Sequence, residues 1–156
     1  MDEFLGVLSR WLHIIPACLA IGGAVFIRFI LPVGLSVLEP EQQKIVYLRC
    51  RRVFKMLIHT SILLLLLSGT YNTIMNWPKY KLVVPMSHML FGLHVLFGLA
   101  IFAISLILLA GKEPPPMHKK WMVVNVLLMM IAVAAASTLK WVRDHAPAAA
   151  STTQQK

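Results

Sequence analysis

Four long apolar blocks constrain this chain more than any other feature of its sequence. They extend approximately over residues 11–31, 56–77, 82–110 and 121–142. Each block is long enough for a helix that crosses a hydrocarbon layer of about 30 Å, which takes about 20 residues. Residues 62–67 are apolar on every face of such a helix, whereas the strands of a membrane barrel alternate in polarity. The pattern predicts an all-α integral membrane protein with the architecture of a four-helix bundle.

The composition agrees with this class and with a single domain. Hydrophobic residues make up 58% of the 156 residues and charged residues 13%, whereas a soluble domain carries more charge between its apolar segments. Because the connections are too short to fold alone, we expect one four-helix domain over residues 1–143. The small, polar residues 144–156 predict a disordered tail. The first block follows Asp2 and Glu3 and continues to Leu31, so we expect it to remain as a membrane helix and not to be a removable signal peptide.

Local signals predict where some of the helices begin and end. Pro40, flanked by glutamates, is typical of a helix N-terminus, so the second helix should begin well before the hydrocarbon. Pro85 can start the third helix. Gly111 and the prolines at 114–116 should end it.

The basic residues predict an orientation in the membrane. The first and third connections, with the helix ends that they join, hold nine of them: Arg28, Lys44, Arg49, Arg51, Arg52, Lys55, Lys112, Lys119 and Lys120. The opposite side holds six: Arg10, Lys79, Lys81, Lys140, Arg143 and Lys156. Cytoplasmic loops carry the excess of Lys and Arg, so both termini should lie outside, which in a bacterium is the periplasmic side of the inner (plasma) membrane.

The same distribution explains the net charge of +9 without a nucleic acid. Lys and Arg at membrane helix ends face anionic lipid head groups. No surface of interleaved basic and aromatic residues is visible, so we expect the lipid bilayer and no nucleic acid as a partner. The sequence also contains no P-loop, dinucleotide fingerprint, Cys-rich metal motif or hydrolase elbow.

The candidate functional residues are among six histidines. His13, His59 and His94 lie inside apolar blocks, where an imidazole is costly to bury and indicates a function. His13 and His88 should lie at similar levels near the outer ends of the first and third helices. His94 should lie about 9 Å deeper than His88, turned from it by about 120°. His59 belongs near the inner end of the second helix, too far from His94 to share a metal with it.

This division predicts a cofactor site near the outer face. A b-type haem takes two axial ligands from facing helices. We therefore expect haem b between the first and third helices, bound by His13 and His94, with His88 as the substitute partner. A second haem near the inner surface would use His59.

Small residues accompany His13 along the first helix. Ala17, Ala20 and Ala24 follow it at spacings of four, three and four, so they share one face within about 60°. They would leave room for a flat cofactor beneath the imidazole. Close packing of helices through small residues is the alternative, and the sequence leaves both open.

Copper is the competing metal. Met86, His88 and Met89 cluster at the outer end of the third helix, and together with His13 they could receive copper from outside, since thioether and imidazole suit Cu(I). Methionine is also an ordinary filler of apolar helices, and the chain has nine.

Purely structural roles are the third interpretation. His94 could hydrogen-bond a neighbouring helix, and Thr60 and Ser61 could satisfy His59. His118 and His145 are expected to be bystanders. In that case the chain would be an accessory subunit of a larger membrane complex.

Sparse positions across the four blocks resemble a known superfamily. They are Leu12-His13-Ile14-Ile15 leading to Gly23, Arg51-Arg52-Val53-Phe54-Lys55 leading to Gly69, and Trp121 and Asn125 before an apolar run that ends at Lys140. This arrangement is similar to the superfamily that contains copper-resistance protein D and HemJ-type protoporphyrinogen oxidase. The resemblance implies a four-helix membrane domain, with b-type haem in one branch and periplasmic copper handling in the other.

The resemblance also bears on individual residues. It maps the histidine of the family's first helix onto His13. HemJ-like enzymes carry a lysine in the third helix, in a His-Ala-Lys-like stretch, and the nearest counterpart here is His94. This departure counts against protoporphyrinogen oxidase activity, while a histidine at that position suits a second axial ligand. Arg51 and Arg52 could hold haem propionates only near the inner surface, so we expect them to set topology.

The function expected from these observations is membrane redox chemistry or electron transfer by a haem protein, with a redox partner or other membrane subunits.

Overall fold

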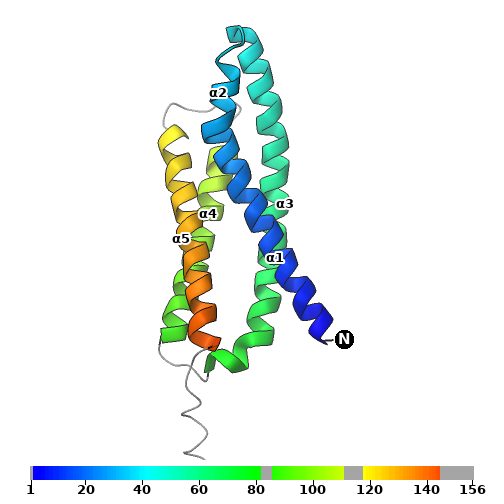
Figure 1. Cartoon of the computed structure of the whole chain (residues 1–156), viewed down its shortest axis with the longest axis vertical. Helices are drawn as coiled ribbons and strands as arrows, with labels where there is room; N and C mark the ends of the chain where they lie inside the picture. The colour runs from blue at the N-terminus through cyan, green and yellow to red at the C-terminus, as the bar shows by residue number, and fades with distance from the viewer. Residues whose placement is uncertain (1, 82–85, 111–117, 145–156) are drawn as a thin grey trace, which may run out of the picture.

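The structure, a computed structural model, describes residues 2–81, 86–110 and 118–144, and every element in these ranges is helical (Figure 1). The elements are α1 (Asp2–Val25), η1 (Phe26–Ile30), α2 (Leu31–Leu35), α3 (Pro40–Lys81), α4 (Met86–Ala110) and α5 (His118–Asp144). Four segments are long and apolar enough to cross a membrane, namely Phe4–Leu35, Pro40–Trp77, His88–Ala110 and Lys120–Trp141. The predicted class, an all-α four-helix membrane bundle, is confirmed.

The first membrane segment is one helical path made of three elements. Pro32, at the start of α2, has no backbone N–H to continue the regular ladder. The preceding turn, η1, widens into a π-helix, in which the N–H of Leu31 bonds the carbonyl of Phe26, five residues back. The path therefore continues to Leu35, past the predicted end at Leu31.

The second segment, α3, begins at Pro40 as predicted and is 42 residues long. At a rise of 1.5 Å per residue it measures about 63 Å, about twice the thickness of the hydrocarbon. Its N-terminal part and α2 extend together past the ends of α4 and α5 (Figure 1). α4 ends at Ala110. Our predictions for Pro85, Gly111, residues 114–116 and the tail after Asp144 fall outside the described residues.

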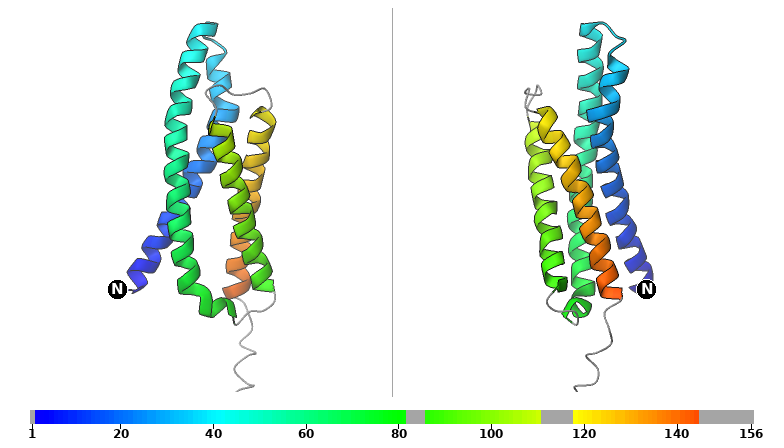
Figure 2. Two further views of the ribbon diagram at one scale, coloured as in Figure 1. Left: turned by 180° about the vertical axis from the view of Figure 1, so that it is seen from behind. Right: turned by 60° about the vertical axis from the view of Figure 1, so that its left-hand side comes forward.

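The helices associate as two pairs. α1 packs along α3, and α4 packs along α5, while α1 meets α5 and α3 meets α4 over smaller areas (Figure 2). α1 and α4 consequently lie diagonally across the bundle. The core between the pairs is built from Ala20, Ala24, Ile58, Ile101, Leu109, Met129 and Ala132.

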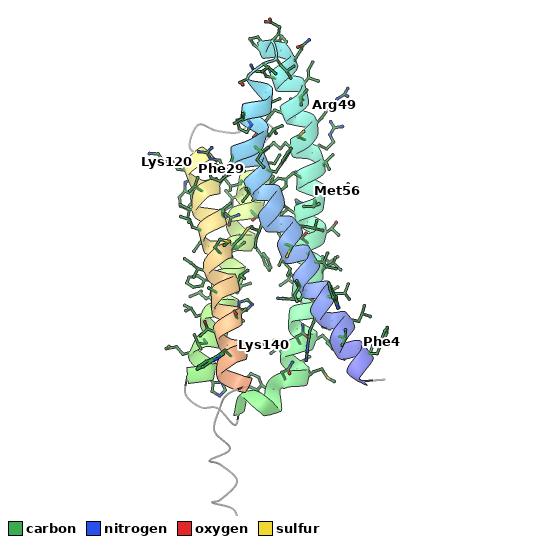
Figure 3. The ribbon with its side chains drawn as sticks, viewed as in Figure 1. Phe4, Phe29, Arg49, Met56, Lys120 and Lys140 are labelled. Carbon is green, nitrogen blue, oxygen red and sulfur yellow. The ribbon has the colours of Figure 1, made fainter. Side chains whose placement is uncertain are left out.

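Large apolar side chains cover the outside of the bundle. Phe4 is 70% exposed and Met56 is 68% exposed, and Figure 3 shows both on the outer surface. Such an apolar exterior on four long helices is consistent with a lipid environment.

Candidate functional site

The structure brings His13 of α1 and His94 of α4 together across the bundle diagonal. Their ring centroids are 6.4 Å apart, and the two ring planes are inclined by 49°. Both side chains are half-buried. The two imidazoles thus approach each other from the helices for which the sequence predicted a shared site.

A serine on α3 orients the ring of His13. Ser68 Oγ lies 3.0 Å from His13 Nδ1, and the hydroxyl itself donates to the carbonyl of Leu64 at 2.6 Å. Because that hydroxyl proton is already used, Oγ accepts from His13, and Nδ1 must carry the hydrogen. This leaves Nε2 of His13 as the nitrogen with a bare lone pair.

A backbone carbonyl on α5 orients the ring of His94 in the same way. His94 Nδ1 lies 3.1 Å from the carbonyl oxygen of Ala132. A carbonyl can only accept, so Nδ1 is again the protonated nitrogen and Nε2 again carries the lone pair. Each imidazole is therefore held by the second helix of its own pair.

This pattern is the one that metal-binding histidines need. A ligating histidine usually donates its other ring N–H to a carbonyl, a carboxylate or another acceptor, which fixes the tautomer and the orientation of the ring. Both rings already meet this requirement through Nδ1.

The separation of the rings also agrees with ligation of one metal. An imidazole nitrogen binds a metal at about 2.0–2.1 Å and lies about 1 Å from the centre of its ring, so two rings on opposite sides of one ion have centres about 6 Å apart. The observed separation is 6.4 Å. Histidine is a common protein ligand of haem iron, so two facing imidazoles would fit this group as its donor set.

A glycine on α3 allows His13 to occupy its position. A Cβ atom added to Gly69 would lie 3.3 Å from His13 Cε1, which is closer than an ordinary van der Waals contact. Gly69 is one of the positions on which the resemblance to the superfamily rests. Its contact with His13 explains why a residue without a side chain is needed here.

Further polar groups extend from this site along α1 and α3. Ser9, which is buried, donates to Asn72 Oδ1 at 3.1 Å, and Asn76 donates to the carbonyl of Asn72 at 2.7 Å. The buried hydroxyls of Ser9 and Ser68 thus fasten α1 to α3 around His13.

The other predicted ligands do not join this pair. The ring of His88 is exposed and packs against the ring of Trp77, with centroids 6.1 Å apart. Met89 is 67% exposed. The side chain of Met86 lies outside the described residues, so the described part of the copper cluster consists of two exposed side chains.

His59 lies apart from the pair as well. It is exposed, and its Nδ1 is 2.6 Å from the carbonyl of Lys55 on the same helix. The side chain of His118 and all of His145 fall outside the described residues. Within those residues, no group of three or more His, Cys, Asp or Glu side chains is placed to hold a metal ion.

The alanines below His13 have more than one environment. Ala20 and Ala24 are buried in the main core, where they allow close helix packing. Ala17, one turn from His13, is half-buried and lies outside that core cluster. Close packing of helices, the alternative considered for this row of alanines, therefore accounts for Ala20 and Ala24. Of the three alanines, Ala17 is the one nearest His13 along the helix.

Sequence reasoning missed the groups that support the site. Ser68 lies within an apolar block and Ser9 just before one, and a single serine hydroxyl in such a place is a weak signal. Arg51, expected to set topology, is 9% exposed and donates to the carbonyl of Leu108 at 3.1 Å, so its guanidinium lies inside the bundle. Nothing in the run of basic residues distinguishes Arg51 from its neighbours.

Comparison of the chain with protein-family models, with curated proteins and with solved structures gives no match. The similarity to the copper-resistance D and HemJ superfamily therefore rests on the sequence positions alone.

Proposed function

We propose that this chain is an integral membrane b-type haem protein that transfers electrons, with His13 and His94 as the two axial ligands. The observation that carries the proposal is the meeting of two imidazoles from diagonal helices, each with Nδ1 engaged as a donor and Nε2 left to bind iron. Haem, when bound, supplies reversible one-electron chemistry within an apolar bundle.

The residues around the pair suit this role. The hydrogen bonds from Nδ1 to Ser68 and Ala132 raise the basicity of the ligands and hold both rings in one orientation. Because each of these bonds stays within its own helix pair, a group held by both imidazoles would not need either bond to break. Ala17 adds little bulk beside His13.

An optical spectrum tests this function. Purified protein from cells supplied with haem should show a Soret band that is lost or strongly altered in His13→Ala and in His94→Ala. His88→Ala and His59→Ala are the matched controls and should leave the band unchanged. The proposal would be contradicted if the wild type showed no Soret band, or if the band were unchanged in His13→Ala and His94→Ala. Either result would favour an accessory subunit whose histidines only join helices.

The proposed membrane is the inner (plasma) membrane, with both termini outside. The basic residues near the α2–α3 end support this orientation, and it places the histidine pair nearer the outer face. In a background without Cys18 and Cys50, a cysteine introduced by Glu41→Cys should react with an impermeant maleimide only after the cells are permeabilised. Labelling of intact cells would reverse the orientation.

A further inference from the structure

A second polar cluster lies in the half of the bundle away from the histidine pair. Arg51 of α3 is seventeen residues from Ser68, about 25 Å along the helix at 1.5 Å per residue. Its side chain is 9% exposed, and Ser105 of α4 and Asn125 of α5 are 5% and 4% exposed. All three line one cavity of about 30 Å³, together with Tyr47 and mainly apolar side chains.

A helix end offsets part of the charge of Arg51. Its Nη2 donates to the carbonyl of Leu108 at 3.1 Å, within the last turn of α4. The C-terminal carbonyls of a helix carry partial negative charge and stabilise a nearby cation. The polar surroundings of the guanidinium thus already include an electronegative group that offsets part of its charge.

Asn125 presents an acceptor to the same cavity. Its Nδ2 donates to Ser105 Oγ at 2.9 Å. Its Oδ1 is buried and has no hydrogen-bond partner among the described residues. Buried side-chain oxygens in proteins are almost always hydrogen-bonded, so this atom calls for a ligand that donates.

We propose that the cavity beside Arg51 and Asn125 is a binding site for ordered water. A volume of about 30 Å³ accommodates one or two water molecules, and a buried water needs two to four polar partners. Water can donate to Asn125 Oδ1 and accept from a guanidinium N–H, which a purely accepting anion cannot do. The site connects α3 to α5 and so joins the two helix pairs. It does not depend on haem binding at the other end of the bundle.

Radiolytic hydroxyl labelling of the protein in lipid nanodiscs tests the water site. Met129 lines the cavity and is 6% exposed, whereas its neighbour Met130 is 56% exposed on the apolar exterior. Radicals formed from a water in the cavity should oxidise Met129 at least severalfold more than Met130. Equal or lower oxidation of Met129 would overturn the proposal.

Asn125→Leu supplies the second arm. It removes the acceptor and replaces the amide with a bulkier, apolar group of the same branching, so the excess labelling of Met129 should disappear. Persistence of that excess in the folded variant would overturn the assignment. If the variant does not fold, a crystal structure of the wild type at about 2 Å resolution, from crystals grown with bromide, tests the site instead. A water within about 3 Å of Oδ1 supports the site. A dry cavity, or an anomalous bromide peak in it, refutes it.

Discussion

Ser68→Ala is the substitution that tests most directly whether Ser68 orients His13 for the proposed haem. Ser68 is 5% exposed, and its Oγ is 3.0 Å from His13 Nδ1. Alanine removes the acceptor and leaves the rest of the α3 backbone in place. The Nδ1–H of His13 then loses its Ser68 acceptor, and the ring loses one of the contacts that fix its orientation.

The expected loss follows from this hydrogen bond. A buried donor left without its acceptor costs about 1–3 kcal/mol, which corresponds to about 5-fold to 150-fold in an equilibrium constant. Removal of the hydrogen-bond partner of a metal-ligating histidine typically lowers affinity about 10–100-fold. We therefore expect Ser68→Ala to weaken haem binding about tenfold or more.

The measurement is a haem titration of the apoprotein followed at the Soret band, together with the reduction midpoint of the loaded protein. Ser61→Ala is the matched control, because Ser61 is also a buried serine of α3, 3% exposed, two turns away from the pair. Ser68→Thr keeps the hydroxyl and should restore most of the affinity. Equal affinity and equal midpoint for the wild type and Ser68→Ala would refute the reasoning, since the bond would then contribute nothing to ligation.

Two further substitutions test the packing and the opposite end of the bundle. Gly69→Ala places a Cβ 3.3 Å from the ring of His13. The matched control is Gly22→Ala, whose Cβ meets nothing within 4 Å. Relative to this control, we expect Gly69→Ala to lower the thermal stability and the haem affinity by the equivalent of about 1–3 kcal/mol. Equal melting temperatures and affinities of the two variants would contradict this. Arg51→Leu removes the bond to the carbonyl of Leu108, a loss of about 1.5–3 kcal/mol, so hydrogen exchange in the last turn of α4 should accelerate. Unchanged exchange there would show that the guanidinium does not hold this helix end.

Much of the architecture was predictable because the signals are local. The length and polarity of the apolar blocks predict four membrane helices, and Pro40 predicts where α3 begins. The π-turn before Pro32 was not predictable in detail, because a proline can be accommodated by a kink, a break or a widened turn. Pro40 also predicted that α3 begins well before the hydrocarbon, whereas the packing of its N-terminal part against α2 is a tertiary contact that no local pattern specifies.

The meeting of His13 and His94 was predictable from the sequence, but the groups that hold their rings were not. Depth and helical phase separate His94 from His88 and place His59 elsewhere, as the structure has them. The partners Ser68 and Ala132 depend on how α1 meets α3 and α4 meets α5. A rotation of one helix about its axis by a few tens of degrees would give the two histidines other hydrogen-bond partners, with the same sequence pattern.

The arrangement of hydrogen bonds separates the groups that orient the two imidazoles from the polar contact that joins the helix pairs. Ser68 orients His13 within the α1–α3 pair, and Ala132 orients His94 within the α4–α5 pair, so neither imidazole relies on the opposite pair for its orientation. The bond from Arg51 to Leu108, in contrast, crosses from one pair to the other. Separation of the pairs at the histidine level therefore breaks neither imidazole bond, while the polar contact that joins them lies about 25 Å away along α3.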